Sequence, residues 1–132
     1  MMNRSTPAIV LLLASCARAP APPLFPPSIA GSWKLTESAA QPAANAPEPV
    51  RRLGLKRVER ASYEGQCAIT ADVYELASSA AGLELAQTWR PAADTVFFYK
   101  DTYFAVVKWK NAEKTAVTAF VRDLEKHLGA LR

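Results

Sequence analysis

The chain has 132 residues, of which 50% are hydrophobic and 21% are charged, and its formal net charge is +4. This length leaves room for one compact domain, and the composition is that of a globular protein with a core and not of a disordered chain. The basic residues over positions 51–60 have Glu48, Glu59 and Glu64 among or beside them, which favours a solvated basic edge over a nucleic-acid-binding surface.

The N-terminus has the pattern of an export signal. A single charge at Arg4 precedes an uninterrupted apolar run over residues 8–14. This run is much shorter than the roughly 20 residues of a membrane-spanning helix, but it has the length of a secretory signal core. Residues 13–16, Leu-Ala-Ser-Cys, resemble the lipobox of bacterial lipoproteins. The resemblance implies cleavage after Ser15 and lipidation of Cys16; the alternatives are an ordinary signal cleaved after Ala19 and a cytosolic protein with an apolar N-terminus.

Lipidation of Cys16 would place the protein in the cell envelope, anchored by lipid and facing the periplasm. The residue after this cysteine is Ala17 and not aspartate, which by resemblance to enterobacterial sorting favours the outer membrane over the inner one. Cys67 then remains as the single free thiol, and its alternation with Ile69 predicts a small buried hydrophobe more than a reactive thiol. If Cys16 is not lipidated, a Cys16–Cys67 disulfide is the alternative.

Residues 17–27 are almost entirely alanine and proline, a composition that favours extended polyproline II. An apolar island with Trp33 follows over residues 29–35 and indicates a strand or an arm that docks on the domain. The composition of residues 36–49 predicts a second loop. The predicted organisation is a signal peptide over 1–15, a Pro/Ala-rich tether with a short apolar arm over 16–46, and a small α+β domain over 47–132.

Hydrophobic periodicity predicts the elements of this domain. In chain order they are a short helix over 47–54, strands over 56–63 and 67–76, a helix capped at 78–79 and running to about 90, a hairpin of strands 95–99 and 103–109, and a helix from about 112 capped by Asn111. Leu83, Leu85, Ala86 and Trp89 are the expected buried stripe of the first long helix. These two strand-strand-helix units predict a four-stranded antiparallel sheet with both long helices on one face, plus the short N-terminal helix.

Four short segments, 63–65, 72–75, 79–82 and 99–104, resemble an uncharacterised bacterial envelope family known only as a domain of unknown function. The matching features cover about half of the chain and are structural in character. The resemblance therefore supports an α+β fold and implies no activity.

The inventory of reactive groups is sparse. The only histidine, His127, follows Asp123 by four residues on a late, solvent-facing part of the last helix, which is typical of a surface residue and not of a general base. One histidine and one free cysteine cannot supply the usual zinc or iron ligands, and the five glycines form no phosphate-binding loop. We therefore predict a protein that is not an enzyme and that uses no metal or cofactor.

Alternation along residues 67–76 places Asp72 and Tyr74 on the face opposite Cys67. The hairpin that contains Phe97 and Tyr99 is apolar on both faces, so one face must stay uncovered or find a partner. Asp72, Tyr74, Phe97 and Tyr99 are therefore the predicted binding surface. The alternative is that the arm over 29–35 folds over it.

These features predict a membrane-tethered, non-enzymatic protein-interaction module. It would contact the membrane through lipidated Cys16 and an envelope protein through the sheet, without a nucleic-acid partner. The alternative is a small-molecule or lipid carrier with a cavity lined by Trp89, Phe98, Phe104 and Trp109. An enzyme that depends on Asp72 is the third possibility.

Overall fold

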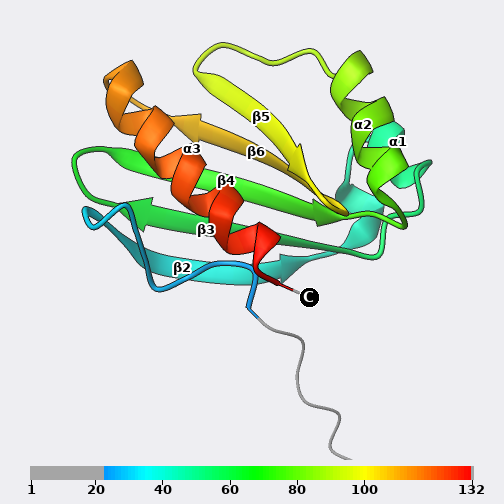
Figure 1. Ribbon diagram of the computed structural model, residues 1–132, viewed down its shortest axis with the longest axis horizontal. Coiled ribbons are helices and arrows are strands. Elements are labelled where there is room, and N and C mark those ends of the chain that lie inside the picture. Colours follow the sequence, from blue (N-terminus) through cyan, green and yellow to red (C-terminus); the bar gives the residue numbers. More distant parts are fainter. Residues whose placement is uncertain (1–22, 132) are drawn as a thin grey trace, which may run out of the picture.

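The computed structural model describes residues 23–131, which form a six-stranded antiparallel sheet and three α-helices (Figure 1). The strands are β1 (Ser28–Ile29), β2 (Trp33–Gln41), β3 (Arg57–Glu64), β4 (Ala68–Glu75), β5 (Thr95–Lys100) and β6 (Tyr103–Trp109). The helices are α1 (Glu48–Arg51), α2 (Ser79–Thr88) and α3 (Lys114–Gly129), and a 3-10 turn covers Ala43–Asn45. The strand order is β1-β2-β3-β4-β6-β5, so β5 forms one edge of the sheet.

The prediction of a four-stranded sheet is wrong, because two further strands come from the segment assigned to the tether. β2 pairs with β3 from Lys34 opposite Glu64 to Gln41 opposite Val58, and β1 pairs with β2. The sequence hides β2 because most of its side chains are exposed, so it lacks the alternation of a half-buried strand. Leu24 and Phe25 are buried as well, so the folded part of the chain includes residues well before position 47.

The prediction that both long helices cover one face of the sheet is also wrong. α3 packs on one side, here called the α3 face, where Phe120, Leu124 and Leu128 meet the buried side chains of the strands. α1 and α2 supply Val50 and Leu85 to a second core on the opposite side, here called the α2 face. The hairpin β5–β6 is apolar on both sides, and one helix on each side covers more of that surface than two helices on the same side would.

The N-terminal arm, here residues 23–35, packs against the α3 face. The ring of Phe120 lies 5.6 Å from that of Trp33 and 5.2 Å from that of Tyr63, both in edge-to-face geometry. The Ala30 amide donates a hydrogen bond of 2.7 Å to Oδ2 of Asp123 on α3. Ala30 has a φ of 51°, and this bond stabilises its left-handed turn. The arm therefore completes the core of the α3 face and does not fold over Tyr99.

Two local predictions, the cap of α2 and the hairpin turn, are confirmed, and a third, the cap of the last helix, is wrong. Ser78 caps α2, since its Oγ accepts a hydrogen bond of 3.2 Å from the Ala81 amide. The hairpin turns at residues 101–102, as expected. α3 begins at Lys114 with Glu113 as its N-cap, whereas Asn111, the predicted cap, has a φ of 50° in the preceding turn.

Candidate interaction surface

Asp72, the first residue of the predicted surface, is engaged in an ion pair. Its side chain lies on the α2 face between Val106 of β6 and Arg60 of β3, and the residue is only 8% exposed. Nε of Arg60 donates to Oδ1 of Asp72 at 2.7 Å, and Nη2 donates to Oδ2 at 3.3 Å. The hydrogen bond and the charge of Asp72 raise the pKa of Arg60. Both carboxylate oxygens are thus occupied, which leaves Asp72 poorly placed to act as a general base.

Tyr74, the second predicted residue, lies under the helices of the α2 face. It is 6% exposed, and its ring centroid lies 6.5 Å from that of Phe104. Burial, and next the negative charge of Asp72, raise the pKa of Tyr74 to about 12. Tyr74 is therefore a core residue that stabilises the fold and cannot itself contact a partner.

Phe97 is half-buried on the same face. Its ring stacks on Phe104 at 5.6 Å, and Trp89, just after α2, contacts Phe104 from another side at 5.2 Å. These aromatic contacts attach the end of α2 to the hairpin. Part of Phe97 remains accessible beside the edge of the sheet.

Tyr99 is the predicted residue that is most accessible. It is 36% exposed, and Leu83 of α2 is 44% exposed; these are the two exposed large apolar side chains within residues 23–131. α2 packs closely on β5 here. A Cβ added to Gly82 would lie only 3.2 Å from the Tyr99 ring. The prediction that Leu83 belongs to the buried stripe is wrong: Gly82 and Leu85 face the sheet, and Leu83 lies about 100° around the helix from Gly82.

An apolar groove lies on the other side of β5, between this strand and α3. It has a volume of about 300 Å³ and is lined by Val96 and Trp109 from the hairpin and by Val117 and Val121 from α3. Two cations, Lys114 and Arg122, also line it. The sequence does not reveal this groove, because Val117 and Val121 follow the spacing of an ordinary core stripe.

The outer edge of β5 is unpaired within the described residues. β5 pairs only with β6, and no other backbone hydrogen bond joins it to the part of the chain that the structure describes. This edge forms one surface together with Phe97, Tyr99 and Leu83 on the α2 face and with the groove on the α3 face. We call it the β5-edge surface. It combines backbone N–H and C=O groups that have no strand partner within the described residues with apolar side chains on both faces of the sheet.

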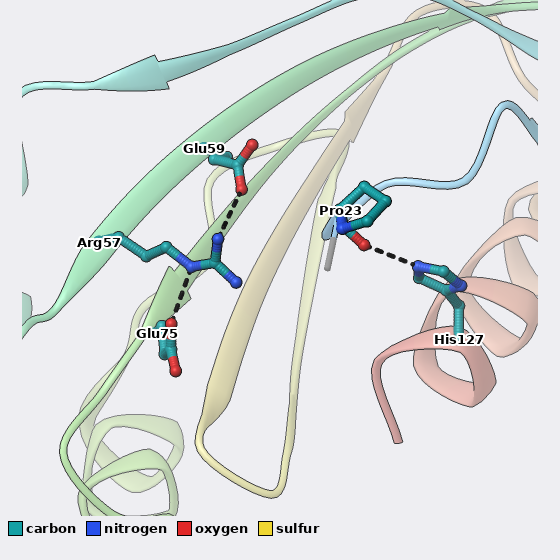
Figure 2. Close-up of polar contacts among 5 residues, drawn as sticks. All are labelled: Pro23, Arg57, Glu59, Glu75 and His127. Carbon is teal, nitrogen blue, oxygen red and sulfur yellow. Dashed lines mark hydrogen bonds and ion pairs between the residues drawn. The ribbon is translucent and has the colours of Figure 1, made fainter. Parts of the chain in front are cut away.

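The other polar clusters contribute to the fold (Figure 2). Arg57 Nε donates to Glu75 Oε1 at 2.8 Å, and Arg57 Nη1 lies 3.4 Å from Glu59 Oε2, which links β3 and β4. The ring of His127 points toward Pro23, and its Nε2 lies 3.2 Å from the Pro23 carbonyl oxygen. His127 therefore attaches α3 to the start of the N-terminal arm.

Residues 23–131 hold no group of three or more His, Cys, Asp or Glu side chains that could bind a metal ion. No helix within the same range is long and apolar enough to cross a membrane. Cys67 is a half-buried free thiol that packs against the core of the α3 face. Cys16 and the predicted signal peptide lie outside the described residues.

Comparison of the chain with protein families, with curated proteins and with solved structures gave no match. The resemblances to the lipobox and to the envelope family therefore stay predictions. The geometry of the β5-edge surface is the main structural guide to function.

Proposed function

We propose that this chain is an envelope lipoprotein, anchored in the membrane through acylated Cys16, whose domain is a non-enzymatic protein-interaction module. The observation that supports this proposal most is the convergence of exposed Leu83 and Tyr99 on a strand with an unpaired edge. Isolated apolar side chains are common on protein surfaces, but here they flank an open sheet edge and an apolar groove.

An open edge of this kind suits the addition of a strand from a partner. In such complexes the backbone hydrogen bonds supply affinity, and alternate side chains of the added strand enter pockets on the two faces. On the α3 face an added strand would meet the groove beside Val96. On the α2 face it would meet Phe97, Tyr99 and Leu83. The two faces therefore offer different side-chain environments, which is a source of specificity.

The geometry gives less support to the carrier alternative. Trp89 and Phe104 contact one another in the core of the α2 face, whereas Phe98 and Trp109 pack on the α3 face. The sheet itself separates these two pairs. The four side chains therefore cannot line one cavity, as that alternative requires.

Site-specific photo-crosslinking in the native envelope tests the interaction module. A photoreactive side chain in place of Leu83 or Tyr99, in the full-length chain, is expected to give discrete crosslinked species. Ala39 is the matched control, because it is an exposed strand residue on β2, far from β5 in the strand order. Crosslinks that are equally strong at position 39, or none at positions 83 and 99, would refute the proposed module.

A further inference from the structure

The hydrogen bonds between β5 and β6 determine which backbone groups face the free edge. The Trp109 amide donates to the Asp94 carbonyl oxygen at 3.1 Å, directly before β5 begins. Bonded and non-bonded pairs alternate in an antiparallel ladder, so Val96, Phe98 and Lys100 are the residues bonded to β6. Thr95, Phe97 and Tyr99 therefore direct their N–H and C=O groups away from β6, toward the open edge.

We propose that the partner of the β5-edge surface is a second copy of this chain, paired antiparallel through β5 with Phe97 opposite Phe97 of the second copy. This inference rests on the proposed function, since it names the partner of the same surface. The two six-stranded sheets would join into one continuous sheet across a two-fold axis. β5 would then no longer be an edge.

This register gives hydrogen-bond partners to the backbone groups of all three outward-facing residues. Thr95 lies opposite Tyr99 of the second copy and Phe97 lies on the axis, so each of these residues meets a bonded partner. A shift by two residues in either direction leaves one of them opposite a residue outside β5. The register also brings Asp94, which lies in the turn directly before β5 with a φ of 54°, near Lys100 of the second copy, twice by symmetry, and thereby places opposite charges close together at both ends of the interface.

The composition of β5 favours such pairing. Its residues 95–99, Thr-Val-Phe-Phe-Tyr, have high strand propensity and contain no proline and no charge. Natural edge strands usually carry a charged residue, a proline or a bulge, which prevents pairing with another strand. The opposite edge of the sheet is protected in this way, because β1 has only two residues and β2 has a register shift between Leu35 and Glu37. Residues 95–99 of β5 carry no such protection, and the single charge of the strand, Lys100, lies at its end.

The dimer is also compatible with two anchors in one membrane. Directly opposed residues in an antiparallel pair point to the same side of a sheet, so the two-fold axis runs perpendicular to it. Pro23 contacts His127 of α3 and thus lies on the α3 face in both copies. Pro23 of both copies therefore lies on the same side of the joined sheet. Anchoring two copies in one bilayer would raise their effective concentration.

Cysteine crosslinking of the full-length chain, in its native membrane under mild oxidation, tests this register. Phe97→Cys is expected to form a symmetric disulfide, because bonded pairs have Cα atoms about 5.5 Å apart, within the range of disulfides. Tyr99→Cys alone is expected not to crosslink, since the two copies of residue 99 would lie four residues apart along the strand, about 13 Å. The unsubstituted chain controls for Cys16 and Cys67.

Phe97→Cys also removes a stacking contact, so a second experiment leaves Phe97 intact. Co-expressed Thr95→Cys and Tyr99→Cys chains are expected to crosslink to each other, although neither crosslinks to itself. Absence of this mixed disulfide, or equal crosslinking of Ser38→Cys on β2, overturns the proposed dimer. If the dimer fails while position 99 still photo-crosslinks to a different protein, the interaction module stands and only the identity of its partner is wrong.

The charge pairs give an independent expectation. Lys100→Glu brings like charges close together twice and is expected to weaken the dimer roughly tenfold in dissociation constant, measured by sedimentation of the full-length protein in detergent. Adding Asp94→Lys to the same chain should restore most of the affinity. Equal dimerisation of the wild type and Lys100→Glu would contradict this register.

Discussion

A chain that begins at residue 47 is expected not to fold cooperatively, because it lacks β1 and β2. These residues are part of the core: Leu24, Ile29 and Trp33 are each at most 1% exposed. Truncating one buried tryptophan or phenylalanine typically costs about 3–5 kcal/mol, and small domains are stable by only about 5–15 kcal/mol in total. The deletion removes several such side chains together and leaves β3 as an unpaired edge.

Thermal unfolding followed by circular dichroism measures this effect. The chain over residues 47–132 should show no cooperative transition, whereas a chain that begins at residue 23 should keep one close to that of the full-length protein. Trp33→Ala in the full-length chain is the intermediate case and should lower its stability by about 3–5 kcal/mol. A cooperative transition in the chain over 47–132 would show that the arm only decorates an independent domain.

Alkaline pH is expected to destabilise the fold strongly between about pH 10 and pH 12. Burial raises the pKa of Tyr63 well above its ordinary value, and burial together with Asp72 raises the pKa of Tyr74 to about 12. Below pH 10 both states keep these protons, so the stability is fully present. Above pH 10 the unfolded chain releases them first, and each tyrosine then costs about 1.4 kcal/mol per pH unit until the folded form also ionises.

Urea unfolding of Tyr74→Phe and wild type at pH 8 and pH 11.5 isolates the contribution of Tyr74, because all other titrating groups are common to both proteins. The variant should lose less stability than the wild type between these two pH values, by about 1–2 kcal/mol. Tyr99→Phe is the matched control for loss of a hydroxyl at an exposed position. Equal losses for Tyr74→Phe and wild type would mean that folding does not raise the pKa of Tyr74.

Elements with a clear period could be predicted from the sequence. α3 follows the helical spacing of its apolar residues, with Val117, Phe120, Leu124 and Leu128 buried, and the strands over 57–64 and 68–75 lie within one or two residues of their expected ranges. β2 could not be predicted in this way, because it is stabilised by ladder hydrogen bonds to β3 and by Trp33 at one end. Its small and polar side chains carry no signal of burial.

The sequence of the hairpin contains a signal for the arrangement of the helices. A hairpin with apolar residues on both faces requires cover on both faces, and Phe98 and Phe104 indeed pack on opposite sides of the sheet.

For the candidate surface, alternation placed Asp72 and Tyr74 on the correct side of β4. It could not show that Arg60 binds Asp72 or that α1 and α2 cover Tyr74, since both depend on tertiary contacts.

Native mass spectrometry of the full-length protein, extracted from the envelope of its host, tests the central claim most directly. The proposed membrane-tethered interaction module predicts a mature chain that starts at acylated Cys16 and retains a second polypeptide, with twice the protomer mass if that polypeptide is a second copy. An unlipidated chain that retains residues 1–15, or a monomer bound only to a small molecule, would contradict it.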